Sequence, residues 1–129
     1  MIYNLVYYLI AQLTSINFTA DGFKKVNQNN IVTVDDNGGF PQPNHDRKDY
    51  TIQFLSRGED TFIARKQSYD VYNLINKKFG LILPEVIIGA ETFPQVKTWR
   101  IVAQALPGFI GNDKNGLPLF STNYIITTD

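Results

Sequence analysis

A strand that leads directly into an amphipathic helix constrains this chain more than any other feature. In residues 50–56 apolar and polar side chains alternate, and this period of two predicts a half-buried β-strand. An Arg-Gly pair ends the strand. Glu59 and Asp60 then open a helix, because acidic side chains stabilise the positive end of the helix dipole. We expect this main helix to stop at Gly80.

A second helix is predicted at the start of the sequence. Between Met1 and Leu13 the apolar residues recur at helical spacing and form one stripe. The segment lacks the basic region and cleavage site of a signal peptide, and about a dozen residues are too few to span a bilayer. We therefore interpret it as a core helix. The residues expected between the sheet and the main helix are Leu5, Val6, Leu9 and Ile10.

The remaining chain predicts short strands that are separated by turns. The turn cluster at 111–116 divides the last two strands, which we expect to pair as a long hairpin. Pro84 and Gly89 divide an apolar run and leave residues 81–94 ambiguous. Besides 50–56, the expected strands are 15–23, 31–34, 98–106 and 117–128.

These elements predict an α+β fold. Two α-helices would pack on one face of a mostly antiparallel β-sheet of about four or five strands. The length of 129 residues indicates one domain over 1–129.

The composition excludes several classes of function. Twelve basic residues balance twelve acidic ones, so no overall field attracts the chain to nucleic acid or to an anionic membrane. The absence of cysteine removes disulfides, cysteine-based zinc sites and thiol catalysis, and it is consistent with a reducing compartment.

The connection at 36–49 is long for a loop. Two glycines end the preceding strand, and Pro41 and Pro43 prevent regular structure up to Asn44. A structureless connection of this length usually has a function, and Phe40 lies among charges that a core would not accept unpaired. We therefore expect the loop to act between molecules. The candidate interface residues are Asp36, Gly38, Gly39, Phe40, Pro41, Arg47 and Lys48.

No constellation of residues predicts catalysis, a cofactor or a metal. His45 is the one histidine, and it has no nucleophile near it in the sequence. Asp35 and Asp36 lack a third ligand. Residues 112–116 resemble a calcium loop only faintly, because the acidic alternation is broken, and we interpret them as a turn. The paired glycines lack the lysine of a phosphate loop. We expect the protein not to be an enzyme.

Four segments, taken together in order, resemble the small tail-terminator proteins of long-tailed bacteriophages, which are also classified as minor capsid or tail completion proteins. The first is the N-terminal amphipathic helix, and the second is a strand that ends in Asp-Asn-Gly-Gly before a proline-containing loop. The third is the strand-helix unit, and the fourth is C-terminal. The matching residues beyond the first helix are 36–39, 50–54, 69–75, 107–116 and 120–124. The chain departs from the family pattern at 24–30 and 81–94.

The resemblance implies a structural function in the virion. Tail terminators form a six-fold ring on the head-proximal end of the tail tube, stop its polymerisation and provide the surface that joins the head. The implied partners are further copies of this chain, the major tail tube protein and the head-completion or connector protein. DNA would pass through the ring without sequence-specific binding, and assembly would take place in the host cytoplasm. Neither catalysis nor a cofactor is implied.

Two other interpretations remain open. The chain could be another phage neck or tail tube protein that forms the same kind of ring. It could also be a small cytoplasmic enzyme or ligand-binding α+β domain that uses the 36–49 loop as a lid. A ring-former would show multimers, whereas the latter class would show a ligand in a pocket.

Overall fold

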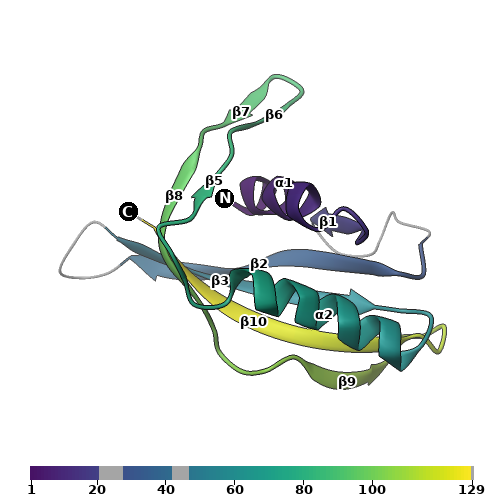
Figure 1. Ribbon diagram of the computed structural model, residues 1–129. Helices are drawn as coiled ribbons and strands as arrows, with labels where there is room; N and C mark the ends of the chain where they lie inside the picture. The colour runs from purple at the N-terminus through teal and green to yellow at the C-terminus, as the bar shows by residue number, and fades with distance from the viewer. Residues whose placement is uncertain (21–27, 42–46, 129) are drawn as a thin grey trace.

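The computed structural model describes residues 1–20, 28–41 and 47–128 (Figure 1). Within these ranges the chain forms two helices, neither of which is long and apolar enough to cross a membrane, and ten strands. In chain order they are α1 Ile2–Gln12, β1 Phe18–Ala20, β2 Ile31–Pro41, β3 Lys48–Arg57, α2 Thr61–Ile75, β4 Lys78–Phe79, β5 Ile82–Leu83, β6 Val86–Ile88, β7 Glu91–Phe93, β8 Val96–Ala103, β9 Gly108–Asn112 and β10 Pro118–Thr128.

Eight of these strands form one mixed, mostly antiparallel sheet that is centred on β10. One side of β10 pairs with β3 from Leu119 to Thr128, and its other side pairs first with β9 and then with β8. β2 follows β3, and β1 joins β2 in parallel. β4 and β5 extend the sheet beyond β8. The predicted α+β class is confirmed, but the strands are more numerous than predicted.

The strands that the sequence did not predict are short segments in which apolar and polar side chains do not alternate. β4 and β5 have two residues each, and β9 contains two glycines among its five residues, so no alternation can develop in them. The predicted pairing of the strands at 98–106 and 117–128 is confirmed by the ladder between β8 and β10. β9 comes between them in the chain and pairs with the first half of β10.

Both helices cover the same face of the sheet and share one core. α1 lies over β1 and β2, while α2 lies over β10 and β3. The buried core includes Leu5, Val6 and Leu9 from α1, Val71 and Ile75 from α2, and Val32, Val34, Ile52, Phe54, Ile101, Tyr124 and Ile126 from the strands.

The predicted position of α1 between the sheet and α2 is wrong. α1 lies over β1 and β2, whereas α2 lies over β10 and β3, so the outer side of α1 remains in solvent. Leu5, Val6 and Leu9 are buried as expected, but Ile10 is 43% exposed.

α2 begins where the sequence predicts. The Asp60 carboxylate accepts a hydrogen bond from the Ile63 N–H at 2.8 Å, which is a typical N-cap. Ser56 on β3 donates to the Ala64 carbonyl at 2.8 Å, and Gln67 donates to the Ser56 hydroxyl at 3.0 Å. These buried bonds attach the helix to the strand that precedes it.

The predicted stop of α2 at Gly80 is wrong, because the helix ends at Ile75. The Lys77 N–H donates to the Ile101 carbonyl at 2.8 Å, and the Asn76 side chain accepts from the Ala103 N–H at 2.9 Å. The residues that were predicted to form the last helical turn thus pair with β8 and form β4.

The ambiguous segment at 81–94 contains a hairpin that stands apart from the main sheet. β6 and β7 pair only across a tight turn at Gly89, whose φ is +60°. Figure 1 shows this hairpin projecting past α1, away from the sheet. We call residues 86–93 the β6–β7 arm.

Candidate functional site

The predicted loop at 36–49 is mostly a β-ribbon in the described residues. β2 continues to Pro41 and pairs with β3 up to Lys48, so the prediction that the two glycines end the strand is wrong. The connecting residues 42–46, which include His45, lie outside the described residues. We call 36–41 and 47–50 the β2–β3 ribbon.

A β-bulge lets β2 continue through its two glycines. Asp36 lies opposite Ile52 and Gly39 opposite Tyr50, so a step of three residues on β2 (39 − 36) matches a step of two on β3 (52 − 50). An extra residue of this kind bends the strand without ending it.

Each of the two glycines is favoured in the bulge for a different structural reason. Gly38 has a φ of +87°, a left-handed conformation that favours glycine, and its N–H donates to the Asp36 carboxylate at 2.8 Å. Gly39 approaches the opposite strand so closely that a Cβ would lie 2.0 Å from the Asp49 carbonyl oxygen. The Asp-Asn-Gly-Gly sequence is therefore a bulge signal rather than a stop signal.

An aromatic ring flanked by two cations lies beside the ribbon. The Arg47 guanidinium lies 4.0 Å from the centre of the Trp99 ring, and the Arg100 guanidinium lies 5.1 Å from it. Trp99 is 39% exposed, and the register of β8 with β10 shifts at this point. Nearby, Thr127 donates to the buried Asp49 carboxylate at 2.6 Å. The sequence reasoning placed Trp99 in a strand but missed its contact with the ribbon.

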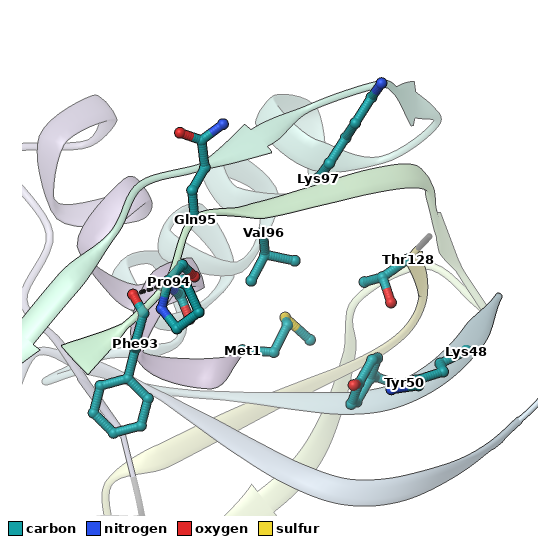
Figure 2. Close-up of a pocket in the computed structure, with 10 residues that line it drawn as sticks. Met1, Lys48, Tyr50, Phe93, Pro94, Gln95, Val96, Lys97 and Thr128 are labelled. Carbon is teal, nitrogen blue, oxygen red and sulfur yellow. Dashed lines mark hydrogen bonds between the residues drawn. The ribbon is translucent and has the colours of Figure 1, made fainter. Parts of the chain in front are cut away.

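A pocket of about 310 Å³ lies beside the ribbon. Lys48 and Tyr50 of β3, Thr128 of β10 and Val96 of β8 line it, together with Met1 and the base of the β6–β7 arm. Figure 2 shows the side chains of Met1 and Val96 pointing toward one another across it. The pocket therefore joins the ribbon, the arm and the N-terminal helix.

Asn4 fixes the arm to this junction. Only 1% of Asn4 is exposed, and its side-chain amide donates to the backbone carbonyls of Pro84 at 2.8 Å, Phe93 at 3.2 Å and Pro94 at 3.0 Å. The Tyr3 and Phe93 rings are also in contact, with centres 4.9 Å apart. The one sequence signal for this role is a polar residue on the buried side of an apolar helix.

The other candidate ligand groups have local partners. Asp35 accepts a hydrogen bond from the Thr33 hydroxyl at 3.3 Å. Asp113 accepts from the N–H groups of Leu117 and Asn115, each at 2.9 Å. These bonds, first that of Leu117, hold the pKa of the Asp113 carboxyl below its usual value. Residues 112–116 form the predicted turn. In the described part of the chain, no three His, Cys, Asp or Glu side chains gather as a metal site.

The structure gathers the predicted interface residues on the ribbon. Asp36, Gly38, Gly39 and Lys48 are exposed, and Arg47 is half-buried. The backbones of Phe40 and Pro41 belong to β2, while their side chains are outside the description.

Comparison of the sequence with protein-family models and with curated proteins gives no match.

Proposed function

We propose that this protein is a structural component of a bacteriophage tail. In this proposal it forms a ring at the head-proximal end of the tail tube, stops polymerisation of the tube and joins it to the head. The observation that carries the proposal is the β2–β3 ribbon, in which β2 continues to Pro41 beyond its pairing with β1, which ends at Val34. Strand pairs of this kind offer backbone edges to neighbouring molecules.

A ring requires two different contact surfaces on every subunit. Each subunit binds one neighbour with the first surface and the other neighbour with the second. The ribbon and the β6–β7 arm are two projections that point in different directions (Figure 1). The balance of acidic and basic residues also suits a channel, because many phosphate contacts would retain DNA.

The cluster of Arg47, Trp99 and Arg100 supports a partner contact beside the ribbon. Tryptophan and arginine are enriched among the residues that contribute most to binding at protein interfaces. Lys48 is exposed at the end of β3, next to this cluster. We assign this surface to the tube or to the head-completion protein.

A ligand-binding domain is the second candidate function. The pocket beside the ribbon favours it, since about 310 Å³ lies at the lower end of the volumes of small-molecule sites. Native mass spectrometry of the protein purified from its host should detect a retained small molecule if this alternative is correct.

The test of the proposed function is a tube-capping assay. The tail tube protein encoded in the same genome is polymerised with and without this chain, and tube lengths are measured by electron microscopy. We expect shorter tubes with additional density at one end. Tubes of unchanged length with bare ends would overturn the proposal.

A matched pair of variants tests the assigned surface in the same assay. Lys48→Glu reverses a charge on the ribbon, and Lys78→Glu reverses the charge of another exposed strand lysine, on β4. We expect Lys48→Glu to weaken capping or head attachment at least tenfold and Lys78→Glu to change neither. Equal effects of the two variants would exclude the ribbon surface.

A further inference from the structure

We infer that the β6–β7 arm of one copy of this chain binds the outer edge of β9 in a second copy, so that copies associate head to tail. The inference rests on the proposed function, because it names the contact that would join subunits within the ring. The partner is a second molecule of the same chain.

The arm is an apolar element that the rest of its own chain leaves uncovered. Ile87 is 67% exposed and Ile88 is 40% exposed, whereas Val86 at the base is only 3% exposed. An isolated two-stranded hairpin is marginally stable in water, and each strand here has three residues. Asn4 holds the base in place through its three hydrogen bonds, so the tip is presented in a fixed direction. Such preorganisation lowers the entropic cost of binding.

β9 is an apolar edge strand that contains no charged residue and no proline. It pairs with β10, and among the described residues no strand pairs with its other side. Phe109 is 54% exposed and Ile110 is 57% exposed. Natural edge strands are commonly protected by charges or proline, and the sequence of β9, Gly-Phe-Ile-Gly-Asn, contains neither. The edge can therefore accept a further strand by β-augmentation.

The two surfaces also have complementary charge. Glu85 and Glu91 are the charged residues in the stretch from 82 to 96. On the other surface, Arg65 lies over the Phe120 ring at 5.6 Å, and Phe120 contacts Phe109. Lys114 follows β9, and its acidic neighbour Asp113 already pairs with Arg57 at 3.5 Å. Opposite charges of this kind favour arm-to-edge contacts and disfavour arm-to-arm contacts.

The position of the two elements requires a second molecule. Figure 1 shows the arm and β9 on opposite sides of the chain, with α1 and the sheet between them. The arm therefore cannot reach the β9 edge of its own copy. A contact between two different surfaces is heterologous, and repeated copies close into a ring or extend into a filament.

The absence of cysteine allows a direct test by disulfide trapping. Ile87→Cys and Phe109→Cys proteins are mixed and oxidised, and disulfide-linked dimers are separated on non-reducing gels. We expect the mixture to cross-link at least ten times faster than either variant alone. Phe79→Cys is the control, because Phe79 is 69% exposed and lies on β4, outside both surfaces. Equal rates for Phe79→Cys and Phe109→Cys with Ile87→Cys would overturn the inference.

The head-to-tail arrangement is tested with a chain that carries both cysteines. We expect Ile87→Cys/Phe109→Cys to give a ladder of multimers that ends at the number of subunits in the ring. Dimers alone would indicate an isologous contact and would overturn the inference. Circular dichroism of every variant checks that the fold is retained, which we expect because both replaced side chains are exposed.

Failure of the inference can be distinguished from failure of the proposed function. A ladder from a protein that neither caps tubes nor forms rings on tube ends would support the arm contact and overturn the tail function. Rings on tube ends without the cross-link between Ile87→Cys and Phe109→Cys would support the tail function and overturn the arm contact.

Discussion

The side-chain amide of Asn4 donates a hydrogen bond to the Pro84 carbonyl at 2.8 Å, although the two residues are 80 positions apart. The same amide also bonds to the carbonyls at the other end of the arm. A single residue of α1 therefore closes the base of the β6–β7 arm and determines where the arm points.

The first prediction concerns this contact. Asn4→Leu leaves three backbone carbonyls without their donor, and we expect a loss of about 1–3 kcal/mol in the free energy of unfolding. Relative to the wild type, amide hydrogen exchange should accelerate more in the arm than in β10. Asn73→Leu, at an exposed position of α2, is the control and should change stability by less than about 0.5 kcal/mol. Unchanged exchange in the arm would contradict the role of Asn4.

The second prediction separates the two sides of α1. Leu9 is fully buried, so Leu9→Ala should lower the free energy of unfolding by about 2–5 kcal/mol. Ile10 is the next residue but is 43% exposed, and Ile10→Ala should cost about 1 kcal/mol or less. Urea denaturation of both variants measures the difference. A cost at Ile10 as large as at Leu9 would place the helix between two layers after all.

The third prediction concerns the bulge. Gly39→Ala would bring a Cβ within 2.0 Å of the Asp49 carbonyl oxygen, and the two strands would have to separate. We expect a loss of about 1–3 kcal/mol or more, measured by thermal melting and by loss of amide protection in the ribbon. Gly108→Ala is the control, since no atom lies within 4 Å of its added Cβ. Equal melting temperatures for the two variants would contradict the close approach.

The fourth prediction is a dependence on pH. Burial, and then the nearby Tyr72, raise the pKa of the Tyr124 hydroxyl above its ordinary value. The unfolded chain releases this proton near pH 10, while the folded chain retains it. The unfolded state then binds fewer protons, so stability is full below about pH 10 and falls as the pH rises toward the folded pKa.

Tyr124→Phe should remove this part of the pH dependence. The difference in slope between wild type and variant above pH 10 should approach about 1.4 kcal/mol per pH unit. At pH 7 the change should be small, because the Tyr124 hydroxyl has no hydrogen-bond partner among the described residues. Chemical denaturation between pH 8 and about pH 11 measures both effects. Parallel pH profiles for the two proteins would contradict the prediction.

The long, periodic elements follow from local sequence. The apolar stripe of α1, the alternation in β3 and β10 and the Asp60 cap of α2 all agree with the structure. In each case one side of the element is buried, and burial selects the period of 3.6 or of 2 that the sequence displays. The turn at 112–116 is equally local, since Asp113 bonds to residues two and four positions away.

Partners that are distant in the sequence decided the rest. The residues predicted as the last turn of α2 pair with β8 instead. Asp-Asn-Gly-Gly forms a bulge because β3 continues opposite it. The hydrogen bonds of Asn4 fix the direction of the arm. Trp99 contacts Arg47 because β3 and β8 both pair with β10. A backbone hydrogen bond can form with any strand that tertiary packing brings close, so no local pattern identifies its partner. The sequence by itself therefore determined the fold class and the main elements, while the ribbon, the arm and the edge of β9 depended on tertiary structure.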